Sequence, residues 1–142
     1  MIKNIPVPGI EEYEKGFWEA ALESKLVVQH CHDCDQPRFP PRPMCPQCHC
    51  LEYTWNQVSG EGEIWSFVVP RPPLLPVFEE ISPYAVGLVS IKEYPLIRMI
   101  GRLKFNNEQN EDNFEEIIIG SEVQVSFQKI SEEICLPYWV MG

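Results

Sequence analysis

Residues 31–48 read CHDCDQPRFPPRPMCPQC, in which two C-x2-C pairs are separated by ten residues. Two residues between the cysteines of a pair allow a tight turn that aims both thiolates at one point. The ten residues between the pairs suffice for a hairpin return but not for a hydrophobic core of their own. The spacing therefore predicts a rubredoxin-like zinc ribbon whose structural Zn²⁺ ion is held by Cys31, Cys34, Cys45 and Cys48.

Disulfide pairing of the six cysteines is the alternative to a metal site. Residues 1–6 contain no apolar segment of the kind that a secretory signal peptide requires, so we expect a cytoplasmic protein. Thiols stay reduced in that compartment, and paired C-x2-C motifs there bind metal more often than they form disulfides. The ligands alone do not distinguish zinc from iron, because an S4 iron site uses the same tetrahedral geometry.

The residues that follow the second cysteine of each pair are unusual for a ribbon. The chain commonly turns there with a positive φ angle, which favours glycine, whereas this sequence has Asp35 and His49. Aspartate tolerates the left-handed region better than histidine does. Of the remaining cysteines, we expect Cys50 to be a free thiol near the metal and Cys135 to pack as a small apolar side chain.

The periodicity of the chain divides its 142 residues into three parts. Residues 1–25 are predicted to form an N-terminal helical segment, because apolar residues recur there at helical spacing. Residues 26–50 are the ribbon, which opens with a strand over 26–30. Residues 51–142 alternate as short strands and are predicted to form an OB-fold domain. The fold class is thus mainly β, with a closed barrel favoured over an open sandwich.

The predicted strands of the OB-fold domain are 53–58, 63–69, 84–92, 96–105, 122–130 and 136–141. Gly60 and Gly62 mark a corner between the first two of them. The proline-rich segment 70–83 is predicted to be a long connection, and residues 106–116 an acidic loop.

The net charge of −10 is concentrated in that loop and in the helical segment, whereas the ribbon is neutral. A protein that follows a nucleic-acid backbone needs a basic groove, so this distribution argues against such a function. No apolar run approaches the ~20 residues of a membrane span. The sequence contains no P-loop, G-x-G-x-x-G, G-x-S-x-G or H-E-x-x-H motif. Because a closed S4 site has no open position for a substrate, we expect no catalytic residues.

Several short motifs follow one another in a recognisable order. They are Phe17-Trp18, Pro40-Pro41-Arg42, Cys45-Pro46-x-Cys48, Ser59-Gly60-x-Gly62-x-Ile64-x-Ser66-Phe67, Pro83-Tyr84, Gly120-Ser121-x-Val123 and Leu136-Pro137. This order resembles a family of zinc-ribbon plus OB-fold proteins, formerly a domain of unknown function, that is found beside thiolases. The resemblance covers nearly the whole chain from Gly9. The departures from it are Asp35, His49 and the acidic loop.

What the resemblance implies is a non-catalytic accessory subunit of acyl-CoA metabolism. Its implied partner is a thiolase-fold enzyme: a thiolase, a hydroxymethylglutaryl-CoA synthase or an aldolase that cleaves steroid side chains. Such subunits bridge two enzymes or complete an acyl-CoA tunnel, so acyl-CoA at a shared interface is a further expectation. No membrane partner is expected.

The candidate partner contacts are large apolar side chains. Leu74, Leu75 and Phe78 belong to the proline-rich connection, where proline lowers the entropy lost on binding; the alternative is that they cap the barrel end. Trp18 and Trp139 are two further candidates.

Three arginines, Arg38, Arg42 and Arg71, are candidate contacts for the phosphates of CoA, although each could equally form a surface ion pair. Two other functions remain open. A single-stranded nucleic-acid binder would use the OB fold and predicts salt-sensitive oligonucleotide binding. An electron carrier with S4 iron predicts a red protein with a reversible one-electron couple.

Overall fold

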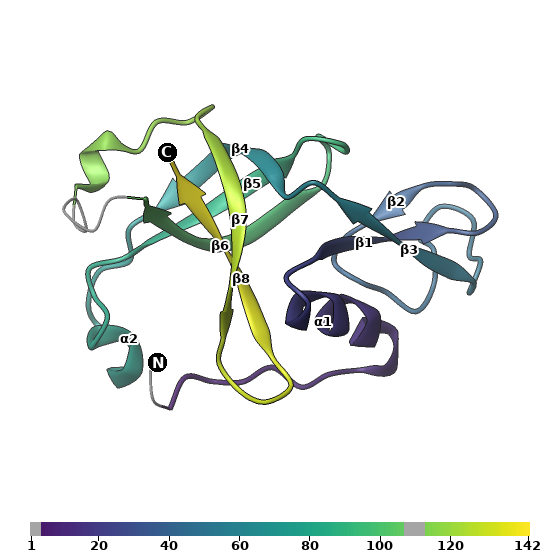
Figure 1. Cartoon of the computed structure of the whole chain (residues 1–142), viewed down its shortest axis with the longest axis horizontal. Helices are drawn as coiled ribbons and strands as arrows, with labels where there is room; N and C mark the ends of the chain where they lie inside the picture. The colour runs from purple at the N-terminus through teal and green to yellow at the C-terminus, as the bar shows by residue number, and fades with distance from the viewer. Residues whose placement is uncertain (1–3, 107–112) are drawn as a thin grey trace.

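The computed structural model describes residues 4–106 and 113–142, so residues 107–112 of the predicted acidic loop lie outside the described residues. Within those ranges the chain forms a three-stranded sheet and a five-stranded barrel. Helix α1 (Lys15–Leu22) lies between the two, as Figure 1 shows. The predicted mainly β fold, with one N-terminal helix, is confirmed.

The N-terminal segment becomes helical at η1 (Glu12–Glu14) and continues directly into α1. A capping box stabilises the start, because the backbone N–H of Glu11 donates to the Glu14 carboxylate over 3.1 Å. Phe17 faces the core, and the helix ends where Ser24 takes a positive φ of 59°. No helix within the described ranges is long and apolar enough to cross a membrane.

The ribbon's sheet has the order β2-β1-β3 and consists of β1 (Leu26–Cys31), β2 (Pro37–Arg38) and β3 (Tyr53–Val58). Both pairings are antiparallel, and β3 pairs with β1 along its whole length, from Leu26 opposite Val58 to Cys31 opposite Tyr53. Strand β3 lies within the part 51–142 that was predicted as the OB-fold domain, but it pairs with the ribbon's sheet. Alternation in a sequence indicates a strand but not the strand with which it pairs.

The barrel is closed in the order β4-β5-β6-β8-β7 by β4 (Glu61–Val68), β5 (Ala85–Ile91), β6 (Arg98–Phe105), β7 (Glu122–Lys129) and β8 (Cys135–Met141). Strands β6 and β8 are parallel, and the other neighbours, including the closing pair β4 and β7, are antiparallel. Two short helices lie in the connections, α2 (Pro76–Glu79) and η2 (Phe114–Glu116). A five-stranded barrel of this kind is the predicted OB fold.

One continuous hydrophobic core joins the three parts of the chain. It contains Phe17 of α1, Leu26 of β1 and Val58 of β3 together with barrel residues such as Ile64 and Trp139. The ribbon and the helix are therefore packed on the barrel rather than tethered to it. Trp139 is completely buried in that core. This burial corrects the expectation that Trp139 contacts a partner, because its side chain fills the barrel and has no exposed surface.

Gly62 is required where β4 lies between two neighbours. It pairs with Ile91 of β5 and with Val123 of β7, and a Cβ atom there would lie 2.6 Å from the carbonyl oxygen of Ser90. We expect Gly62→Ala to lower the free energy of unfolding by about 1–3 kcal/mol, because the backbone must shift to admit the methyl group.

Urea denaturation measures this loss. Gly9→Ala is the control, since nothing lies within 4 Å of a Cβ atom at Gly9, and it should change stability by less than about 0.5 kcal/mol. Equal stability of the two variants would show that β4 and β5 do not approach so closely.

Candidate functional site

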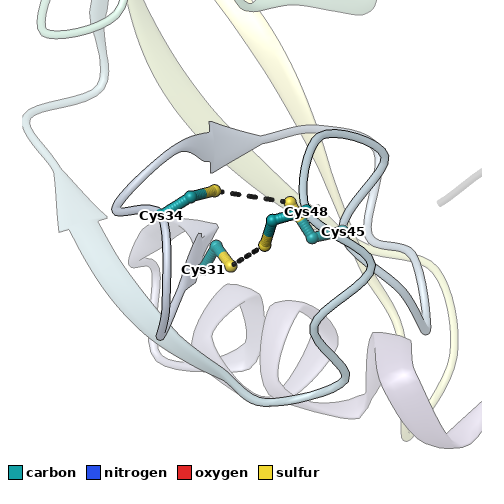
Figure 2. Close-up of side chains that lie close together, drawn as sticks. All are labelled: Cys31, Cys34, Cys45 and Cys48. Carbon is teal, nitrogen blue, oxygen red and sulfur yellow. Dashed lines mark hydrogen bonds between the residues drawn. The ribbon is translucent and has the colours of Figure 1, made fainter.

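The four predicted metal ligands are brought together by two turns. Cys31 ends β1 and Cys34 follows in the first turn, while Cys45 and Cys48 belong to the second (Figure 2). All four Sγ atoms lie within 4.8 Å of one another. We call these four residues the cysteine cage.

Two distances across the cage show that a metal ion fits. The Sγ atoms of Cys31 and Cys48 are 3.5 Å apart, and those of Cys34 and Cys45 are 3.6 Å apart. A tetrahedral zinc ion with Zn–S bonds of about 2.3 Å requires sulfur atoms about 3.8 Å apart. The arrangement is therefore that of a metal site, and all four cysteines are free thiols.

Each of the two turns is closed by an equivalent backbone hydrogen bond. The N–H of Cys31 donates to the carbonyl of Gln36 over 3.0 Å, and that of Cys45 donates to the carbonyl of Cys50 over 2.9 Å. Each turn also contains the predicted left-handed residue, since φ is 56° at Asp35 and 63° at His49. The turns thus have the backbone conformation of a ribbon although neither contains glycine at this position.

Backbone N–H groups favour the thiolate form of two ligands. The N–H of Cys34 is the main cause that lowers the pKa of Cys31 to about 6, and the N–H of Cys48 likewise lowers the pKa of Cys45. Although the N–H of Cys50 favours the thiolate of Cys48, desolvation and the three neighbouring sulfur atoms raise the pKa of Cys48 to about 12. Four sulfur atoms this close cannot all be thiolates unless a cation lies among them, which is what a divalent metal supplies.

A metal held by the whole cage has a structural role. Four protein sulfur atoms complete the tetrahedron, so no position is left for a water molecule or a substrate. What the cage does is hold two turns of the chain that have no core of their own.

A buried polar cluster on β1 and β2 of the ribbon corrects another prediction. Gln29, which is completely buried, accepts hydrogen bonds from the Nε of Arg38 at 2.9 Å and from the backbone N–H of Arg42 at 2.7 Å. Arg38 is only 6% exposed and its guanidinium lies 5.3 Å from the ring centroid of Tyr53. Arg38 therefore stabilises the ribbon and is not available to the phosphates of CoA.

Gln29 was not among the residues predicted from the sequence. The sequence feature that could have indicated its burial is its position as a polar residue beside Val27 and Val28 in a short apolar strand. Arg42 and Arg71 are exposed, so for these two the contact with CoA phosphates stays a prediction.

An apolar groove of about 360 Å³ lies where the ribbon, the helix and the barrel meet. Its walls are Trp18 of α1, residues 39–41 between the two turns of the cage, Ile100 and Arg102 of β6, and Tyr138 of β8. Trp18 is partly buried and packs on the core cluster. Its predicted contact with a partner would thus have to be made through the groove.

The other predicted partner contacts lie in the connection between β4 and β5. Leu75 is 60% exposed, whereas Leu74 and Phe78 are partly buried. The ring of Phe78 lies 6.3 Å from that of Tyr84. Of these three residues, Leu75 offers the most apolar surface to a partner, and the contacts themselves remain predictions.

A four-cysteine ribbon followed by a closed five-stranded barrel defines the class of zinc-ribbon OB-fold proteins. Two family models assign the chain within this class. The ChsH2 rubredoxin-like zinc ribbon domain matches residues 18–50, and the ChsH2 C-terminal OB-fold domain matches residues 55–128. The chain belongs to this family, also called DUF35, and the resemblance noted in its sequence is confirmed.

Three similar proteins illustrate the family. A DUF35 domain-containing scaffold protein of Pyrococcus furiosus is 32% identical over 117 residues, which are 82% of this chain and 79% of that protein. A probable enoyl-CoA hydratase alpha subunit of Thermomonospora curvata is 38% identical over 89 residues, which are 62% of this chain but 27% of that protein. The solved structure of an Ltp2–ChsH2(DUF35) aldolase contains a chain that matches with a TM-score of 0.79 and 30% identity, covering 95% of this chain and 98% of that one.

Loss of one cage ligand should release the metal and loosen the ribbon. We expect the wild-type chain to hold one metal ion and Cys45→Ser to hold none, with Tm lowered by about 10 °C because the turns have no other core. Elemental analysis and thermal denaturation measure both. Cys50→Ser is the control, because Cys50 lies beside the cage but is not part of it. A Cys45→Ser protein with full metal content would refute the cage.

The left-handed residues provide a second test. Glycine at position 49 relieves the strain of a positive φ at histidine, and part of that gain is offset by the greater freedom of glycine in the unfolded chain. We expect His49→Gly to raise the free energy of unfolding by about 0.5 kcal/mol. The same change at Asp35 should have almost no effect, because aspartate tolerates this region. Destabilisation by His49→Gly, measured in urea, would indicate that the imidazole has a role of its own.

Proposed function

We propose that the chain is a non-catalytic accessory subunit that binds a thiolase-fold enzyme of acyl-CoA metabolism and helps to bind or channel its acyl-CoA intermediates. The observation that carries the proposal is the similarity, over 95% of the chain, to a subunit of the Ltp2–ChsH2(DUF35) aldolase. Relatives named as scaffold proteins and as a hydratase alpha subunit support the same role. We propose zinc as the metal of the cage.

The chemistry of the described residues supports a non-catalytic role. The cage is closed to substrates, and the nearby histidine His32 is an exposed surface residue 4.0 Å from Glu52. The two buried polar side chains among the described residues, Gln29 and Arg38, are both used in the ribbon. A subunit of this kind contributes binding surface to an enzyme rather than an acid, a base or a nucleophile.

The groove beside Trp18 suits the apolar acyl group better than the other large cavity does. A second cavity, of about 480 Å³, lies at the end of the barrel and is lined by Glu61, Glu63 and Glu122 with Lys92 as the one cation. Its carboxylates would repel the phosphates of CoA. The groove is instead mainly apolar and has the guanidinium of Arg102 in its wall, so an acyl chain and a thioester oxygen would both find partners there.

Contacts with the enzyme are proposed at Trp18 and at Leu74, Leu75 and Phe78 of the proline-rich connection. Arg42 and Arg71, both exposed, are proposed contacts of the CoA phosphates at the shared interface. The preformed proline-rich backbone would lose little entropy on binding.

The proposal predicts that the tagged chain, purified from its native cells, brings with it a thiolase-fold enzyme that converts an acyl-CoA. The isolated chain should show no turnover of the same substrate. Leu75→Asp should weaken the complex about tenfold or more by placing a charge in an apolar contact. Ile119→Asp is the matched control, because Ile119 is equally exposed at 61% but precedes β7. Purification of the chain without any acyl-CoA enzyme would refute the proposal.

A further inference from the structure

One strand of the barrel carries a row of cations on its outer face, of which Arg98 is exposed and Arg102 and Lys104 are partly buried. Alternate residues of a strand share a face, and along β6 the outward residues are Arg98, Ile100, Arg102 and Lys104. The residues between them, such as Met99 and Leu103, are buried in the barrel. Three of the eleven basic residues of the chain therefore lie on one face of one strand.

Each of these cations lies against an aromatic ring. The Cζ of Arg98 is 3.9 Å from the ring centroid of Trp65, and the Cζ of Arg102 is 5.7 Å from that of Tyr84. The Nζ of Lys104 is 4.4 Å from the ring centroid of Tyr138. An aromatic ring holds a cation in place but does not neutralise it.

No carboxylate of the described residues forms an ion pair with any of the three, although acids outnumber bases by ten in the whole chain. Burial, and then the charge of Arg102, lower the pKa of Lys104, and burial also lowers that of Arg102. The positive charges of this face are thus oriented by rings and are left without a compensating acid in the described structure.

The same face has an apolar centre. Ile100 is 69% exposed and Val68 is 57% exposed. They are joined through the sheet, because Ile100 pairs with Leu88 of β5 and Val68 pairs with Val86, the partner of Arg102. Trp65, half exposed, extends this surface toward Arg98. Exposed apolar side chains with a charged border are characteristic of protein interfaces.

We infer that the outer face of β6, formed by Arg98, Ile100, Arg102 and Lys104 with Trp65 and Val68, docks an acidic protein surface. This inference rests on the proposed function and identifies the occupant as the partner enzyme. The docking patch of that enzyme has an apolar centre and carboxylates at its border. Charge complementarity carries this choice, since the face is basic on an otherwise acidic chain.

Single-stranded nucleic acid is the competing occupant of an OB-fold face, and two observations disfavour it. Base stacking needs free aromatic faces, whereas the rings of Trp65, Tyr84 and Tyr138 already have cations over them. Ile100 and Val68 would also contribute little to binding a phosphate backbone, while they contribute apolar area to a protein contact.

Charge reversal tests the inference with the enzyme recovered alongside the wild-type chain. Arg98→Glu and Lys104→Glu should each weaken binding about tenfold, and the double variant about a hundredfold, because attraction becomes repulsion. Added salt should weaken the wild-type complex more than that of the double variant. Arg102 is left unchanged because it also borders the groove.

Two controls separate docking from folding. Lys129→Glu reverses an exposed lysine that belongs to β7 and pairs with Glu132, and it should leave the affinity unchanged. Val68→Glu, at a position that is 57% exposed and lies outside the groove, should weaken binding while Tm stays within a few degrees of wild type. A zero-length carbodiimide cross-link should join the Lys104 amine to a partner carboxylate, and Lys104→Arg should abolish the cross-link while preserving binding.

The outcomes distinguish the inference from the function on which it rests. Wild-type affinity in the double variant would refute the proposed docking surface and leave the accessory role intact. Recovery of no acyl-CoA enzyme with the wild-type chain would refute both. Salt-sensitive binding of a labelled 20-nucleotide oligothymidine, lost in the double variant, would overturn the protein partner in favour of nucleic acid.

Discussion

The convergence of four sulfur atoms is the constraint on which the arrangement of the ribbon depends. The turns that carry Cys34 and Cys48 have few buried residues of their own, so metal coordination, together with the hydrogen bonds of Gln29, holds them in place. Residues 39–41 lie between those turns and line the groove together with Trp18 of α1. The cage therefore influences the rest of the molecule by fixing the position of residues 39–41. Because its ligand set is closed, its role is structural.

A shared core makes the ribbon and the barrel one cooperative unit. Phe17, Leu26 and Val58 belong to the same buried cluster as the barrel residues around Trp139. The passage from β3 to β4 takes only Ser59 and Gly60, and the latter has a positive φ of 83°. So short a connection, with a continuous core on one side of it, leaves the two sheets little freedom to move against each other. A surface that spans both can then be preorganised for a partner.

Local chemistry made much of this structure predictable, and long-range packing accounts for what was missed. The cage, the left-handed Asp35 and His49 and the barrel strands follow from cysteine spacing, turn geometry and alternation, all of which act over a few residues. The pairing of β3 with β1 was missed because alternation does not name a partner. Trp139 and Arg38 were expected at the surface, because residue type alone does not reveal long-range packing. In the structure the barrel closes around Trp139, and Arg38 donates a hydrogen bond to Gln29.

The distribution of charge distinguishes the outer face of β6 from the rest of the surface. Acids cover the helix and the barrel end near Glu61 and Glu122, so the chain as a whole repels acidic proteins and nucleic acids. Three cations collected on one strand create an attractive region against that background. Rings rather than carboxylates hold them, so their charge is available to an incoming surface and little entropy is lost when it is used. For the accessory subunit proposed above, this selectivity would be the main contribution, because such a subunit must recognise one enzyme in one orientation.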